Sequence, residues 1–178
     1  MTHKRKVINI VYNSVFIIMS LILALFFGKI SIFPFLKLDF SDLPVFLATL
    51  ISGASSGIIV LFVVSFLRSL MFSSAGWIGF LIRITTVIVV IGLDLFWHKK
   101  MKMLYKVLGI SFFVILCLAV KLVLNYYFWI NFFGISPGVI NGMLATIILP
   151  YNLLKTTLML IISIFLEKPL KKLISLLN

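Results

Sequence analysis

Six basic residues of this chain lie in or beside apolar segments: Lys29, Lys37, Arg68, Arg83, Lys121 and Lys155. Two of the four acidic residues, Asp39 and Asp42, fall within one twelve-residue stretch, "FPFLKLDFSDLP" at 33–44. A cation inside an apolar segment is costly, so it usually faces a bundle interior or a wet cavity and pairs with another group. We therefore expect some of these cations to face the interior of a bundle or a wet cavity.

Motifs for catalysis and metal binding are missing from the sequence. His3 and His98 have no companion Cys, His or carboxylate at ligand spacing, and the single cysteine, Cys117, lies in an apolar run. The stretch "GASSG" at 53–57 lacks the Gly-Lys-Ser/Thr of a phosphate-binding loop. We therefore expect no enzyme activity, no metal site and no cofactor.

The composition identifies the setting of these residues as a membrane. Hydrophobic residues make up 63% of the chain and charged residues 11%, and the mean hydropathy is +1.28, whereas a soluble domain is about 25% charged. The 178 residues suit a single domain, 1–178, built from spanning helices of roughly 20 residues each. The net charge of +12 would suggest nucleic acid in a soluble protein, but here the basic residues flank membrane spans, so no nucleic-acid partner is expected.

The apolar runs predict an all-α bundle of six transmembrane helices, at about 7–27, 41–52, 56–72, 78–97, 104–128 and 149–166. The second helix is short because a single helix over 44–72 would measure about 43 Å, against a bilayer core of about 30 Å. The glycines of "GASSG" permit a turn at that point. A short segment, "GVINGMLATII", leads into the last helix, and Pro150 suits its first turn.

The basic residues support six crossings. Both chain ends then share a side, and ten of the sixteen basic residues fall in the cytoplasm: Lys4, Arg5, Lys6, Lys99, Lys100, Lys102, Lys106, Lys168, Lys171 and Lys172. The other six map to the outer half: Lys29 and Lys37 to the loop that joins the first two helices, and Arg68, Arg83, Lys121 and Lys155 to the helices. Asp39 and Asp42 can neutralise part of this charge and help to form a lid. The alternatives are that the cations snorkel to the lipid headgroups and that Ser41 or Asp42 caps the second helix.

Three stretches, "FPFLKLDFSDLPVFL", "LVLNYYF" and "LPYNLLKTTLML", resemble in order the substrate-binding S components of energy-coupling factor (ECF) vitamin transporters, closest to the riboflavin type. The resemblance implies a six-helix bundle that binds a water-soluble vitamin near the outer surface, beneath the loop between the first two helices. It also implies partners, namely a transmembrane coupling protein and two ATPase subunits. The expected location is the cell membrane of a prokaryote.

The resemblance implies that Asn125 and Lys155 contact the ligand, since they match ligand-contacting positions of riboflavin members. An amide and an ammonium can read the carbonyl and ring-nitrogen edge of a flavin. The other expected substrate-binding residues are Leu36, Lys37, Asp39, Trp77, Arg83 and Lys121. The family docks on its coupling protein through small residues of the first helix, and the nearest such stripe here is Ser20, Ala24 and Gly28. The same spacing also packs helices inside one bundle.

The start of the fourth helix differs from the riboflavin pattern. A "GPIGELAN"-like stretch is typical there, whereas "GWIGFLIR" at 76–83 has Phe80 and Arg83 in place of the glutamate and the asparagine. An arginine beside Lys121 and Lys155 favours an anion such as pantothenate, and related S components take hydroxymethylpyrimidine or pyridoxine-like compounds. Riboflavin is the first candidate and these are the alternatives. Two other classes stay open: a structural or assembly protein of the membrane, and a proton-coupled carrier.

The charge distribution predicts that both chain ends are cytoplasmic. Cysteines placed within 4–6 or 168–172 should stay unlabelled by a membrane-impermeant thiol reagent in intact cells and should react once the cells are permeabilised. Labelling of either end from outside would contradict the six-crossing topology.

Overall fold

The computed structural model describes residues 3–27, 31–33, 36–37, 40–71 and 77–177. Its helical segments are α1 (His3–Phe27), α2 (Leu43–Ser52), α3 (Ala54–Met71), α4 (Trp77–Ile84), α5 (Val87–Trp97), α6 (Met103–Phe133), α7 (Pro137–Met143), the π-helical η1 (Leu144–Ile148) and α8 (Leu149–Leu177). Two short antiparallel strands, β1 (Ser31–Phe33) and β2 (Leu36–Lys37), lie between α1 and α2. The described part is therefore almost entirely helical, as predicted, with a small hairpin added.

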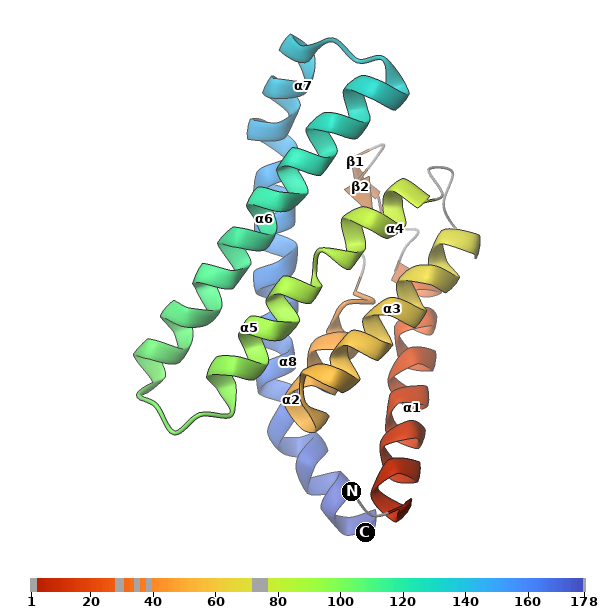
Figure 1. The fold of residues 1–178 in the computed structure, drawn as a ribbon, viewed down its shortest axis with the longest axis vertical. Helices are drawn as coiled ribbons and strands as arrows, with labels where there is room; N and C mark the ends of the chain where they lie inside the picture. The colour runs from red at the N-terminus through yellow and green to blue at the C-terminus, as the bar shows by residue number, and fades with distance from the viewer. Residues whose placement is uncertain (1–2, 28–30, 34–35, 38–39, 72–76, 178) are drawn as a thin grey trace.

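Five helices of the described part are long and apolar enough to cross a membrane: Val7–Phe26, Ala54–Met71, Trp77–Trp97, Met103–Phe133 and Pro137–Ser175. The apolar helix α2 is shorter. In Figure 1 the two chain ends lie together at one end of the bundle, whereas the β1–β2 hairpin and α7 lie toward the other end. This arrangement agrees with six helices of which the second is short. The cytoplasmic location of the chain ends stays a prediction.

Helix α2 is the centre of the bundle. Residues 41–50 are all buried, and α2 packs against α1, α3, α5 and α8. A helix that is apolar all round is typical of a core position. It ends at Gly53, whose φ of 89° favours glycine, and α3 begins at the next residue. The predicted break at "GASSG" is therefore confirmed.

The span predicted over 78–97 is present as Trp77–Trp97, but a turn at Thr85 and Thr86 divides it into α4 and α5. The Thr85 hydroxyl donates to the Ile82 carbonyl at 2.6 Å, and the N–H of Thr86 donates to the Arg83 carbonyl at 3.0 Å. Threonines are stiff at χ1, and a hydroxyl that bonds the preceding turn competes with the regular helical hydrogen bonds. Two adjacent threonines give a physical reason for the break.

The segment before α8 is also helical, since α7 and η1 continue into α8 without a gap. Helix α8 begins at Leu149, as predicted, but Pro150 follows a π-helical turn and does not start a separate helix. Proline lacks an N–H and crowds the carbonyl four residues earlier, which a π turn can accommodate. Helix α8 runs to Leu177 and α6 to Phe133, so both are longer than predicted.

A polar cluster joins α5, α6 and α8 near the chain ends. The indole N–H of Trp97 donates to Glu167 Oε2 at 2.8 Å, and Glu167 Oε1 pairs with Lys171 at 2.6 Å. Lys106 Nζ donates to the Trp97 carbonyl at 2.7 Å and lies 5.3 Å from the centre of the Trp97 ring. Glu167 is buried, so these contacts stabilise its charge away from water.

The close approach of α2 and α3 depends on Gly57. A Cβ at this position would lie 2.0 Å from Thr49 Oγ1 and 3.0 Å from Val90 Cγ1. Gly57→Ala should therefore lower the free energy of unfolding by about 1–3 kcal/mol, the usual cost of overpacking. Thermal unfolding of the purified protein in detergent measures this change.

Gly142→Ala is the matched control, because a Cβ at this helical glycine meets no described atom within 4 Å. This variant should be neutral or slightly stabilising, since alanine favours a helix over glycine. An unfolding temperature that changes equally in both variants would show that the α2–α3 contact tolerates a side chain.

Candidate functional site

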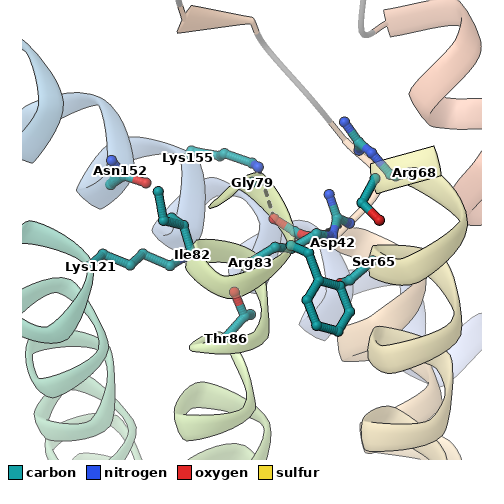
Figure 2. Close-up of a pocket in the computed structure, with 12 residues that line it drawn as sticks. Asp42, Ser65, Arg68, Gly79, Ile82, Arg83, Thr86, Lys121, Asn152 and Lys155 are labelled. Atoms are coloured by element: carbon teal, nitrogen blue, oxygen red, sulfur yellow. Dashed lines mark ion pairs between the residues drawn. The ribbon is translucent and has the colours of Figure 1, made fainter. Parts of the chain in front are cut away.

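A cavity of about 320 Å³ lies among α2, α3, α4, α6 and α8. Its lining residues are Asp42, Ser65, Arg68, Ser69, Gly79, Phe80, Ile82, Arg83, Thr86, Lys121, Asn152 and Lys155. Figure 2 shows side chains from these different helices converging on one space. Among the described residues of the lining, four are cationic and one is acidic. The volume falls at the lower end of ligand pockets, which span about 300–1,000 Å³.

Asp42 joins two of these cations. One carboxylate oxygen lies 2.6 Å from Arg83 Nη2 and the other lies 2.9 Å from Lys155 Nζ, and Figure 2 marks the Lys155 pair. The three side chains are only 9%, 12% and 16% exposed for Asp42, Arg83 and Lys155, respectively. Charges buried to this degree are tolerated when they are paired in good geometry. Asp42 occupies the N-cap position of α2, but its side chain makes no capping hydrogen bond. The alternative that Asp42 caps the second helix is therefore wrong.

Ser41, the preceding residue, contacts three further side chains. Its hydroxyl accepts a hydrogen bond from Arg83 Nη2 at 2.7 Å and another from Arg68 Nη1. Its carbonyl accepts a hydrogen bond from the hydroxyl of Ser20 on α1. We name these two residues, Ser41 and Asp42, the corner. Through it, the start of α2 is connected to α1, α3, α4 and α8.

Two hydroxyls of the cavity wall have no hydrogen-bond partner within the described ranges: Ser65 Oγ and Thr86 Oγ1. The residues are 1% and 2% exposed. A buried polar group that makes no hydrogen bond costs about 1–3 kcal/mol. A polar ligand in the cavity would offer both hydroxyls a partner.

Three of the predicted substrate-binding residues line the cavity: Arg83, Lys121 and Lys155. Lys121 extends from α6 toward α4, as Figure 2 shows, and is only 7% exposed. The three side chains are largely buried within the bundle, which disfavours snorkelling to lipid headgroups for them. Arg68 also lines the cavity and donates to the corner.

The other predicted residues lie elsewhere. Asn125 is one turn beyond Lys121 on α6, where its amide donates to the Lys121 carbonyl at 2.8 Å and accepts from the Trp129 indole at 3.4 Å. It is not among the lining residues, so its substrate contact stays a prediction. Trp77 is exposed and packs beside Phe80, and it does not line the cavity. Leu36 and Lys37 form β2, and Asp39 lies outside the described residues.

Sequence reasoning missed Asn152, which lines the cavity three residues before Lys155. Residues three apart share a helix face, so the stretch "LPYNLLKTTLML" contained a signal for it. Ser65 and Thr86 gave no such signal, because single hydroxyl residues in apolar helices follow no pattern that separates a cavity from a core. Asp42 was expected to neutralise nearby cations, and it does.

The stripe predicted to dock on a partner lies inside the bundle. Ser20 and Ala24 are both buried, and Ser20 donates to the corner. Packing within the bundle, the alternative for this stripe, is what the structure shows for these two residues. Gly28 lies outside the described residues.

The described part of the cavity lining includes no histidine or cysteine, and across the described residues no group of three or more His, Cys, Asp or Glu could hold a metal ion. What the lining offers is ammonium, guanidinium, amide and hydroxyl groups, which are donors for a polar ligand.

Residues 9–167 match the family model for the substrate-specific component of ECF transporters. The chain belongs to this family. A solved structure reported as the S component of a bacterial ECF transporter has a similar fold, with a TM-score of 0.75 and 25% sequence identity over 95% of this chain and 98% of that one. No curated protein matches the sequence significantly. Membership makes the chain a membrane-embedded, substrate-specific component of a transporter, and implies association with the membrane and ATPase modules of an ECF transporter.

The ion pairs of Asp42 should stabilise this S component. Asp42→Asn leaves Arg83 and Lys155 without their carboxylate, and removing one partner of a buried pair typically costs about 3–5 kcal/mol. Asp94→Asn is the control, because Asp94 is a third exposed and lies 3.8 Å from His98; its loss should cost less than about 1 kcal/mol. Thermal unfolding in detergent compares the two variants, and equal losses would refute a special role for the Asp42 pairs.

Proposed function

We propose that this S component captures a water-soluble vitamin in the cavity beside the corner and delivers it inward when an ECF coupling protein and two ATPase subunits act on it. The observation that carries the proposal is a polar, cation-rich cavity inside an apolar bundle. Ionisable groups within membrane segments are expensive and usually serve a substrate or ion path.

The burial of the cations favours this function over a structural or assembly role. Cations that bind lipid headgroups lie on the lipid-facing surface, whereas Lys121 and the Arg83–Asp42–Lys155 group face the interior. The family match favours the same choice and disfavours a proton-coupled carrier.

The proposed direction of capture is from outside. The charge distribution predicts that the chain ends are cytoplasmic, and the β1–β2 hairpin lies toward the opposite end of the bundle (Figure 1). The loop that carries the hairpin leads directly into the corner, so it is well placed to act as a lid over the cavity.

Two classes of vitamin are candidates for the ligand, one supported by the sequence resemblance and the other by the residues that line the cavity. The sequence resemblance favours riboflavin. However, Phe80 and Arg83, the residues that depart from the riboflavin pattern, both line the cavity, so the difference falls in the site itself. An arginine beside Lys121 and Lys155 suits an anion, so an anionic vitamin such as pantothenate is the alternative to riboflavin.

Titration of the purified chain with riboflavin, pantothenate and hydroxymethylpyrimidine tests the proposed function. At least one of these vitamins should bind, and mass spectrometry should find it co-purified from cells. Lys155→Gln should weaken binding about 10- to 150-fold, because a hydrogen bond to a charged donor contributes about 1.5–3 kcal/mol.

Lys168→Gln is the control, because Lys168 is exposed and does not line the cavity; its affinity should equal that of the unmodified chain. Uptake into cells should require the coupling module. Sustained accumulation of the vitamin in cells that lack every such module would contradict the proposed transport role.

A further inference from the structure

We infer that Ser65 and Thr86 form a second polar subsite of the cavity, apart from the corner, and that this subsite binds an alcohol hydroxyl of the ligand. We name these two residues the floor. The inference rests on the proposed function, because it names the ligand group that one part of the same cavity recognises. Both residues line the cavity, and neither was expected from the sequence to contact a substrate.

The floor residues lie together at one end of the cavity. Ser65 precedes the lining residues Arg68 and Ser69 by three and four positions on α3, and residues at this spacing share a helix face. Thr86 stands at the break directly after α4, three residues past Arg83. Helix α3 runs toward the end of the bundle that holds the β1–β2 hairpin and α4 runs away from it (Figure 1), so both hydroxyls lie farther from the hairpin than the two arginines. In Figure 2, Ser65 is drawn below Arg68 and Thr86 below Arg83.

The hydroxyls of the floor are buried and unpaired. Both residues are almost fully buried, and neither side-chain oxygen has a hydrogen-bond partner in the part of the chain that the structure describes. A buried polar group without a hydrogen bond destabilises the folded protein, so nearly all such groups have a partner. A ligand in the cavity can supply that partner.

Other buried hydroxyls of the bundle bond to their own helix. Thr49 donates to the Val45 carbonyl at 2.9 Å, and Ser163 donates to the Met159 carbonyl at 2.7 Å. A bond to the carbonyl four residues earlier is a common way to satisfy a serine or threonine within a helix. The floor hydroxyls make no such bond, so they remain available to a bound molecule.

The chemistry of a hydroxyl indicates which ligand group fits. Ammonium and guanidinium groups only donate hydrogen bonds and a carboxylate only accepts them, whereas a hydroxyl does both. An alcohol of the ligand can accept a hydrogen bond from one floor hydroxyl and donate one to the other. Rotation about χ1 moves a serine or threonine oxygen between staggered positions, so each hydroxyl can turn toward the ligand while the backbone stays in place. The floor therefore suits a neutral alcohol.

Pairs of compounds that differ in their alcohol groups test the inference. The pairs are riboflavin with lumiflavin, pantothenate with its analogue without hydroxyl groups, and hydroxymethylpyrimidine with the same pyrimidine carrying a methyl group instead. Each compound is titrated against the unmodified chain in lipid nanodiscs. In the pair that binds, the alcohol should bind at least about 3-fold more tightly, the contribution of a neutral hydrogen bond. Equal binding of both members would overturn the inference and leave the proposed function standing, whereas binding of none of the six would overturn both.

Two variants of the floor show whether it is the origin of this preference. Ser65→Ala and Thr86→Val each remove one hydroxyl and keep the shape of the side chain nearly unchanged. Each should abolish most of the preference for the alcohol, while the analogue binds as before. Without ligand, each variant should unfold at the same temperature as the unmodified chain or at a higher one, because a buried group without a partner has been removed. An unchanged preference in both variants would overturn the inference, since the hydroxyls would then serve the cavity wall alone, paired with ordered water.

Thr49→Val and Ser163→Ala are the matched controls. They make the same chemical changes at buried hydroxyls that already bond to carbonyls and do not line the cavity. The controls should unfold at a lower temperature and keep the full preference for the alcohol. A loss of preference equal to that of the floor variants would refute a specific role for the floor. If one floor variant does not fold, the other variant and the compound pairs still decide the inference.

Discussion

The pairing of one buried carboxylate with two buried cations at the start of α2 is the constraint on which the rest of this structure depends. In a bilayer, lipid tails are as apolar as the side chains of a helix core, so apolar contact alone distinguishes poorly between arrangements of helices. Asp42, Arg83 and Lys155 come from α2, α4 and α8, and they must meet to avoid isolated charges. Their meeting fixes the position of α2 relative to both neighbours. Near the chain ends, the Glu167 cluster has a similar effect on α5, α6 and α8.

The position of the cavity is related to the short helix α2, which is not long enough to cross a bilayer. At about 1.5 Å per residue, the ten residues of α2 measure about 15 Å, half of a bilayer core of about 30 Å. The break at Thr85 and Thr86 shortens α4 in the same region. Polar side chains from the surrounding helices occupy the walls of the space that remains. The cavity therefore lies where α2 begins and where α4 gives way to α5.

The sequence was most informative at charged residues within apolar runs, because burying a charge in a membrane is energetically costly. Arg83, Lys121 and Lys155 stand out because a charge in an apolar run needs a reason, and all three line the cavity. The helices were predictable from apolar runs and the α2–α3 turn from its glycines. The Thr85–Thr86 break was not, because threonine is common in continuous helices and only its local hydrogen bonds reveal the break. The burial of Ser20 and Ala24 inside the bundle could not be predicted either. Small residues at four-residue spacing occur both at interfaces with a partner and between helices of one bundle.

The length of α6 bears on the bilayer around the protein. Its 31 residues measure about 46 Å, against about 27 Å for the 18 residues of α3. The far end of α6 is rich in aromatic side chains, among them the exposed Tyr127, Phe132 and Phe133, and aromatic rings favour the interface between lipid and water. Hydrophobic mismatch of this kind is relieved by helix tilt or by local changes in lipid thickness. Helices α3 and α6 therefore suit bilayers of different thickness, and a change in lipid chain length alters the mismatch at each helix.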